Sequence, residues 1–191
     1  KLSYHLYAMI ISGIEEVVEK EGYHLMICQT NESYEKEVLN LEMLANGVVD
    51  GIIVSVAKET EEKDDYRHFN ELINNGIPLV MFDRVVDQLN CNKVVADDKG
   101  GAFLATEQLF KNGCSKIALI TTPDYVTVGH ERKEGYLKAL KDNNMAINKE
   151  YIIEVDEKLP IEAQLSSLFQ GNSIPDGIFA VNEIYAATAM K

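Results

Sequence analysis

The stretch "LVMFDRVVDQL", Leu79–Leu89, contains the feature that decides how this chain folds and where it acts. Its first four residues, Leu79 to Phe82, are all apolar, which is typical of a strand buried on both faces. Asp83 and Arg84 follow at once, and charged side chains are costly to remove from water. We therefore expect the strand to end at Phe82 and the chain to leave the core there, with both charges at the carboxyl end.

Similar apolar strands alternate with amphipathic helical segments along the whole chain, and glycine or Asn-Gly pairs mark several helix ends. Such alternation is typical of α/β proteins in which parallel sheets are covered by helices on both faces. The expected strands are 23–28, 51–56, 79–82, 94–96, 116–121, 151–155 and 177–181. The expected helices are 9–18, 33–46, 69–75, 101–111, 131–142, 161–169 and one that begins near 184.

Two polar segments interrupt this pattern. The charge run "KETEEKDD", 58–65, predicts a solvated loop and a first helical turn. The segment "DDKGGAF", 97–103, has adjacent glycines without phosphate-loop spacing, and we expect it to be a tight passage of the chain before a helix.

Composition excludes several classes of protein. The chain has 31 acidic residues against 18 Lys plus Arg, a net charge of −13. So acidic a surface repels the phosphate backbone, so this polypeptide alone is a poor nucleic-acid binder. No apolar run reaches the roughly 18 residues of a membrane span. Cys28, Cys91 and Cys114 lack CxxC spacing, which favours a reducing compartment and predicts neither a disulfide framework nor a metal site. The histidines are scattered, and no cofactor is predicted.

Signatures of catalysis are missing as well. The sequence has no GxSxG nucleophile elbow, no Walker A loop, no HExxH pair and no GxGxxG turn after a strand. We therefore predict no catalytic residues and a protein that is not an enzyme.

Ligands of open parallel sheets bind beyond the carboxyl ends of the strands. Asp83 and Arg84 lie at one such end, and Asn182-Glu183 lies at another in the second half of the chain, so the sequence predicts a cleft between two lobes. Asp83 as acceptor, with Arg84 or Arg132 as donor, would suit a ligand rich in hydroxyl groups. The alternative is that Asp83 and Arg84 pair with each other or cap a loop.

Four segments together resemble one known family: "IPLVMFDRV", "VVADDKGGAFLATEQLFKNGCSKIALITTP", "ERKEGYLKAL" and "IFAVNEIYAATAM". In order and spacing they are similar to the effector domain of lactose-repressor (LacI) family transcription regulators, over essentially the whole chain. The resemblance implies an α/β fold of two Rossmann-like lobes, of the periplasmic-binding-protein type I. Residues 1–97 would form the N-terminal lobe without its first strand, and residues 98–191 a C-terminal lobe that is incomplete at its end.

The same resemblance implies which residues bind the effector. Tyr4-His5-Leu6 departs from the asparagine-proline-aromatic start of the family, so one stacking face is aliphatic at Leu6 while Tyr7 can still stack. The implied ligand-binding residues are Leu6, Tyr7, Asp83, Arg84, Arg132 and Asn182, with Glu183 beside the last.

By this resemblance, the chain is the sensing and dimerising domain of a cytoplasmic transcription regulator. Its effector would be a small molecule, with pentose, hexose, disaccharide and nucleobase all open and a saccharide favoured. It would form a homodimer, for which apolar stripes on 33–46 and 69–73 are candidates, would contact DNA only through a helix-turn-helix module preceding residue 1, and would have no membrane partner. The alternative is a periplasmic sugar-binding protein of a transport system, which shares the fold; the unpaired cysteines favour the regulator.

Overall fold

The structure, a computed structural model, describes residues 5–170 and 174–191. The chain forms two compact units, Lys1–Lys93 and Val94–Lys191, each with its own sheet and core. The sequence had placed the division after Asp97. Tyr4, part of the unusual start discussed above, lies outside the described residues.

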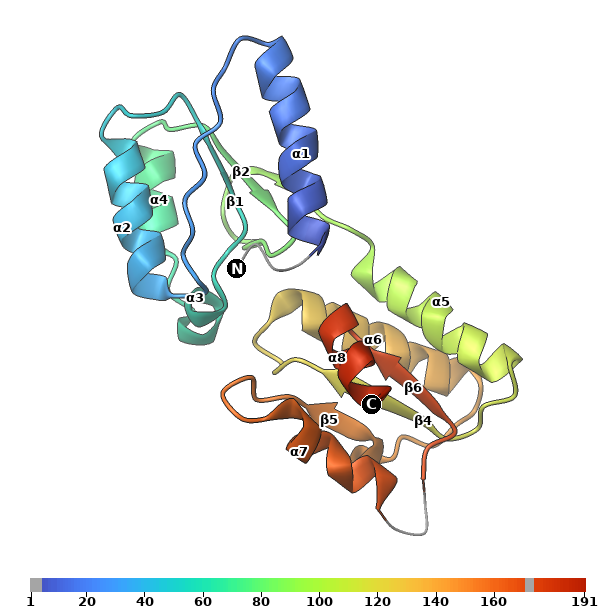
Figure 1. Cartoon of the computed structure of the whole chain (residues 1–191). Coiled ribbons are helices and arrows are strands. Elements are labelled where there is room, and N and C mark those ends of the chain that lie inside the picture. Colours follow the sequence, from blue (N-terminus) through green and yellow to red (C-terminus); the bar gives the residue numbers. More distant parts are fainter. Residues whose placement is uncertain (1–4, 171–173) are drawn as a thin grey trace. The chain divides into compact units, whose positions relative to one another are not determined.

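The sheet of the first unit has the strand order β1-β2-β3. β1 and β2 are parallel, with Ile52 opposite Leu79 and Val54 opposite Met81. Helices α2 and α4 lie side by side on one face of this sheet and α1 lies on the other (Figure 1). The elements are α1 (His5–Lys20), α2 (Tyr34–Ala45), β1 (Ile52–Val54), α3 (Lys58–Lys63), α4 (Arg67–Asn74), β2 (Leu79–Phe82) and β3 (Asn92–Val94).

Apolar residues of α2, α4 and both parallel strands form the core of the first unit. Phe69 and Leu72 are fully or almost fully buried in it, so the stripe on 69–73 is core and the expectation that it forms a dimer surface was wrong. The stripe on α2 differs, since Leu39 and Met43, one turn apart, are 63% and 48% exposed. Only α2 therefore retains an apolar surface of the predicted kind.

The predicted strand at 23–28 is absent from the structure, in which these residues have no regular secondary structure and belong to neither sheet. Tyr23, Met26 and Ile27 are more than half exposed there. The apolar, β-prone composition describes a side chain's fit to a pleated surface, but a strand also needs a neighbour for its backbone hydrogen bonds. No described strand supplies one.

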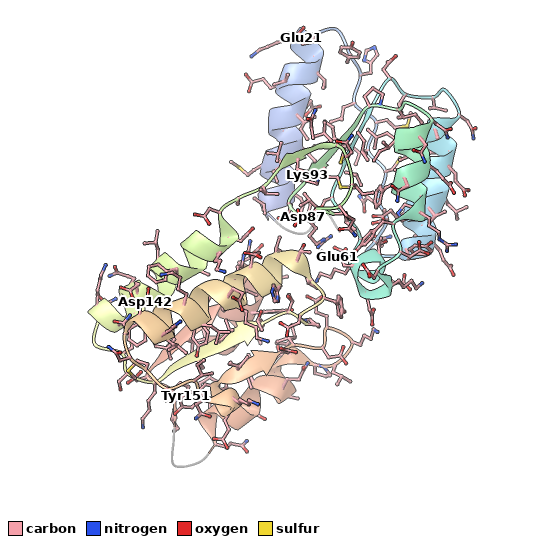
Figure 2. The ribbon with its side chains drawn as sticks, turned by 180° about the vertical axis from the view of Figure 1, so that it is seen from behind. Glu21, Glu61, Asp87, Lys93, Asp142 and Tyr151 are labelled. Atoms are coloured by element: carbon pink, nitrogen blue, oxygen red, sulfur yellow. The ribbon has the colours of Figure 1, made fainter. Side chains whose placement is uncertain are left out.

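The second unit has the parallel sheet order β5-β4-β6, with Leu119 opposite both Ile152 and Phe179. Helices α5 and α6 pack together on one face, and α7 and α8 cover the other (Figure 1, Figure 2). The elements are α5 (Asp98–Lys111), β4 (Ile117–Thr121), α6 (Thr127–Asp142), η1 (Lys149–Tyr151), β5 (Ile152–Glu154), α7 (Ile161–Leu165), η2 (Ser166–Phe169), β6 (Gly177–Ala180) and α8 (Glu183–Ala189).

The central strand β4 is buried along its whole length because it has a strand on each side and helices on both faces. Tyr136 of α6 is packed against it, and its phenolic hydroxyl donates to the Ile117 carbonyl at 2.8 Å. Burial raises the pKa of Tyr136 to about 12, so this hydroxyl remains a donor.

Both polar segments that interrupted the sequence pattern are more regular than expected. α5 already begins at Asp98, and Asp97 caps it by accepting from the Gly100 N–H at 2.8 Å, so the adjacent glycines lie inside the first turn of a helix and not in a loop. The run 58–65 contains the helix α3, in which Thr60 and Glu61 are buried. The prediction that this charged segment is fully solvated was therefore wrong, because residues of other elements bond to Thr60 and Glu61 and bury them.

Candidate functional site

Three polar side chains meet at the carboxyl ends of the strands in the first unit. Ser55 follows β1, Asp83 follows β2, and Tyr7 comes from the first turns of α1. The Tyr7 hydroxyl donates to Asp83 Oδ2 at 2.7 Å and lies 2.9 Å from Ser55 Oγ. The ring of Tyr7 also contacts Phe82 edge to face, with centroids 5.9 Å apart. The sequence predicted Tyr7 and Asp83 here, but not Ser55.

Asp83 has the backbone conformation of a residue under local constraint. Its φ of 59° is left-handed, a region that costs most residues energy and that aspartate tolerates better than others. Burial, above all, raises the pKa of Tyr7, which keeps its hydroxyl protonated and able to donate to Asp83. Among the described residues nothing donates to the second carboxylate oxygen, Oδ1, so Asp83 offers an acceptor at the strand end.

Arg84 is the most enclosed member of the predicted set, only 7% exposed. Its Nε donates to the Val56 carbonyl at 2.6 Å, and its Nη2 donates to both carboxylate oxygens of Glu32, at 3.0 and 2.8 Å. Glu61 of α3, labelled in Figure 2, lies 3.7 Å from Nε. The salt bridges of Arg84 are thus with Glu32 and Glu61, and they tie the end of β2, α3 and the loop before α2 together.

Burial by itself would lower the pKa of the Arg84 guanidinium, but Tyr7, Glu32 and Glu61 raise it overall. Arg84 therefore remains charged. Its Nε and Nη2 already have protein acceptors, so it can offer a ligand fewer donors than the sequence suggested.

A second carboxylate, which sequence reasoning missed, supports the same region. Glu37 of α2 is 1% exposed and accepts from the Ala57 N–H at 2.7 Å, the Thr60 hydroxyl at 2.6 Å and His68 Nε2 at 3.0 Å. Its spacing to Leu41 and Leu44 on α2 places it on the buried face of the helix, and that spacing was a signal available in the sequence.

We expect Glu37→Gln to lower the free energy of unfolding by about 2 kcal/mol. The three donors around Glu37 bond to two charged carboxylate oxygens, whereas the glutamine amide offers them a single neutral oxygen. Urea denaturation followed by circular dichroism measures the change. Glu35→Gln on the same helix, whose side chain is exposed, is the matched control and should change stability by less than about 0.5 kcal/mol. Equal effects of the two substitutions would contradict the assignment of Glu37 as a buried capping group.

In the second unit, Arg132 of α6 reaches the carboxyl end of β6. Its Nε donates to Asp98 Oδ1 at 2.7 Å, and its Nη1 donates to the Val181 carbonyl at 2.5 Å. Nη2 is also 2.7 Å from the same Asp98 oxygen. The remaining N–H groups of the guanidinium have no acceptor among the described residues, so Arg132 keeps donors for a ligand.

Asn182 follows Val181 directly and caps α8, since its Oδ1 accepts from the Tyr185 N–H at 2.8 Å. Its amide nitrogen has no acceptor in the described part of the chain and can donate. Glu183 is exposed in the first turn of α8, and Leu6 is 49% exposed on α1.

The predicted residues therefore gather into two groups, each within one unit. Tyr7, Asp83 and Arg84 lie at the strand ends of the first unit, and Arg132 lies next to Asn182 at those of the second. Asp98, which orients Arg132, was not predicted from the sequence. Its salt bridge joins two helices, α5 and α6, across 34 positions of the chain, so the spacing of neighbouring residues does not indicate it.

A metal site and a membrane span are both absent from residues 5–170 and 174–191. Nowhere in these ranges do three His, Cys, Asp or Glu side chains come together so as to hold a metal ion. Every helix within the same ranges is too short or too polar to traverse a bilayer.

Several known proteins are similar to this chain. The ribose operon repressor of Halalkalibacterium halodurans is 33% identical over 182 residues, 94% of this chain and 51% of that protein. The HTH-type transcriptional repressor PurR of Actinobacillus pleuropneumoniae serotype 5b is 30% identical over 186 residues, 97% of this chain and 54% of that protein. The chain thus spans about half the length of the curated relatives it matches.

Among solved structures, a periplasmic binding protein/LacI transcriptional regulator from Alkaliphilus metalliredigens, complexed with D-xylulofuranose, has a TM-score of 0.75 and 29% identity. It covers 100% of this chain, which covers 67% of it. The family model described as periplasmic binding proteins and sugar binding domain of LacI family matches residues 1–191. The chain therefore belongs to the family of periplasmic binding proteins and LacI-family sugar-binding domains.

Proposed function

We propose that this chain is the effector-sensing domain of a transcription regulator that acts in the cytoplasm and does not catalyse a reaction. Both curated relatives are repressors by name, which favours this function over that of a transport protein. The DNA contacts would be made by a helix-turn-helix module elsewhere in the polypeptide, since a net charge of −13 suits this domain poorly for binding DNA.

The observation that carries the proposal is the presence, at the strand ends of each unit, of polar groups with unused hydrogen-bonding capacity. Asp83 Oδ1 accepts, the outer N–H groups of Arg132 and the Asn182 amide donate, and Tyr7 supplies an aromatic face. Such a mixture suits a saccharide, whose hydroxyl groups both donate and accept and whose carbon face packs on aromatic rings.

In this proposal Tyr7, Asp83, Arg132 and Asn182 contact the effector, with Leu6 and Glu183 at the margin of the ligand. Arg84 acts as a positioning residue, because its bonds to Glu32 and Val56 hold the backbone that carries Asp83. Effector binding then shifts the conformational equilibrium of the domain and with it the affinity for DNA, which requires a coupling of about 1–3 kcal/mol.

The active form in this proposal is a homodimer. The exposed pair Leu39 and Met43 on α2 offers an apolar surface for it. Analytical ultracentrifugation of the protein and of Met43→Glu tests the oligomeric state and the part that α2 has in it.

A sugar panel that includes ribose and xylulose, screened by thermal shift and followed by calorimetry, tests the sensing function. An effector should raise the melting temperature and should alter DNA binding by the full-length protein. A panel without any hit, together with DNA binding indifferent to sugars, would count against the proposal.

Arg132→Ala should weaken binding of that sugar by roughly 30-fold, or about 2 kcal/mol, because it removes charge-assisted donors to the ligand. Calorimetric titration measures the affinity, and the melting temperature reports whether the fold survives. Lys141→Ala, an exposed site on the same helix, is the control and should bind as the wild type does. Unchanged affinity in Arg132→Ala would remove this residue from the site.

A further inference from the structure

Recognition of a phosphorylated ligand requires uncompensated positive charge, supplied by Arg or Lys side chains or by the N–H groups at helix starts. The carboxyl ends of the strands in both units carry such groups. The positive charge available at the strand ends of each unit therefore decides whether a phosphate group can bind there.

In the first unit the cation at the end of β2 is already neutralised. Arg84 holds both carboxylate oxygens of Glu32 at 3.0 and 2.8 Å, and Glu61 lies 3.7 Å away. Two acidic side chains thus face one guanidinium. Lys58, the first residue of α3 after β1, also interacts with another group of the protein and is therefore not a free cation.

The amides at the start of α3 are occupied in the same way. The Ala57 N–H donates to Glu37 Oε2 at 2.7 Å, and the Lys58 N–H donates to Glu32 Oε2 at 3.0 Å. Glu59 in turn accepts from the Tyr34 N–H at the start of α2, at 2.8 Å. The chain's own carboxylates therefore hold the positions that a phosphate would take at these helix starts.

The second unit repeats this arrangement with different residues. Asp98 holds Arg132, with its Oδ1 2.7 Å from both Nε and Nη2. Lys133, next to it on α6, donates to both oxygens of Asp124 at 2.9 Å and to Glu154 at 2.7 Å. Side-chain oxygens also cap two helix starts here, Asp97 on α5 and Asn182 on α8, whereas α6, which follows β4, has no side-chain cap.

Apart from the outer N–H groups of Arg132, whose charge Asp98 already balances, the groups left over at the strand ends are acidic or neutral. Asp83 Oδ1 and the exposed Glu183 are acidic, and the Asn182 amide is a neutral donor. A phosphate dianion brought here would meet like charge, while Arg84, Arg132 and Lys133 are already paired with carboxylates, and such a contact is strongly unfavourable in a desolvated site. A hydroxyl group, in contrast, can donate to Asp83 in the first unit, or accept from Arg132 in the second, without a change in net charge.

We propose that the effector is uncharged and that the domain discriminates against phosphorylated sugars, because carboxylates of the chain already neutralise the cations at its strand ends. This inference rests on the proposed sensing function and specifies the chemical class of ligand. Asp98 is the residue that sets the selectivity in the second unit, since it is the acidic partner of Arg132.

Matched pairs of ligands test the proposal directly: ribose with ribose 5-phosphate, xylulose with xylulose 5-phosphate, and fructose with fructose 1-phosphate. Calorimetry on the wild-type chain should show the phosphorylated member of the binding pair at least roughly 100-fold weaker than the neutral one. A phosphorylated sugar that binds as tightly as its neutral counterpart, or more tightly, would overturn the charge selectivity and leave the sensing function standing.

A second measurement does not depend on finding the sugar. Inorganic phosphate, added at low ionic strength, should leave the melting temperature of the wild type unchanged and should raise that of Asp98→Asn, in which the guanidinium of Arg132 is no longer neutralised. Glu162→Gln, an exposed site on α7 with the same change in charge, is the control and should not respond.

The two proposals can therefore fail separately. If neither the neutral nor the phosphorylated sugars bind, the sensing function lacks support. A rise in melting temperature with inorganic phosphate that is confined to Asp98→Asn would still support the charge selectivity. A response of the wild type to phosphate, or the lack of one in Asp98→Asn, would overturn the selectivity whatever the sugars do.

Discussion

Arg84→Met should lower the free energy of unfolding of the first unit by about 4 kcal/mol, the largest effect expected of a single substitution here. The methionine retains much of the apolar volume but leaves the buried carboxylate of Glu61 and that of Glu32 without their cation. Removing one partner of a buried ion pair costs more than the pair itself contributes, because the remaining charge stays away from water. Hydrogen exchange with mass spectrometry can report on the first unit alone.

The matched control for this prediction is Arg67→Met in the same unit. Arg67 pairs with Asp65 at 2.6 Å, but its side chain is 81% exposed, so the loss should stay below about 1 kcal/mol. Arg84→Met combined with Glu61→Gln should recover part of the loss, because the neutral amide no longer needs a cation. Equal destabilisation by Arg84→Met and Arg67→Met would contradict the assignment of Arg84 as a buried charge partner.

Gly135→Ala should destabilise the second unit by about 3 kcal/mol, because α5 and α6 approach each other too closely for a side chain at this position. A Cβ on Gly135 would overlap the Lys99 carbonyl oxygen and would lie 2.8 Å from Ala102 Cβ and 2.9 Å from the Phe103 nitrogen. Two of these three are backbone atoms, so relief requires a shift of a whole helix. Urea denaturation and hydrogen exchange in α5 and α6 measure the loss.

Gly101→Ala on α5 is the control for this steric argument. Its Cβ would meet nothing within 4 Å, so the substitution should be neutral or should stabilise the helix by about 0.5–1 kcal/mol. Should Gly135→Ala prove as stable as Gly101→Ala, the two helices must be free to separate and the close packing described here would be wrong.

Much of the fold could be predicted because its signals are local. The apolar run at β2 and the polar pair that follows it mark a strand and its end, and the structure places β2 at Leu79–Phe82. Asn46-Gly47 and Asn112-Gly113 mark the ends of α2 and α5 for the same reason, since φ is positive at both glycines. The segment 23–28 shows the limit, because local composition predicts an extended conformation but not the strand that must pair with it.

The candidate site divides in a similar way. The rule for parallel sheets predicted which chain positions lie at strand ends, and Asp83 and Asn182 do lie there, whereas Arg132 is on α6 and was implied by the family resemblance. Ser55, Asp98, Glu32 and Glu37 were not predicted, because their roles depend on partners from 20 to 52 positions away in the chain.

The sequence by itself determined the α/β class, the alternation of most helices and strands, and the positions where charged residues end a strand, because each depends on the composition of a few neighbouring residues. Only the tertiary structure decided which charge stays available to a ligand and which is neutralised within the protein. The electrostatic free energy of Arg84 depends on burial and on the distances to Glu32 and Glu61, and residues remote in sequence set both when the chain folds.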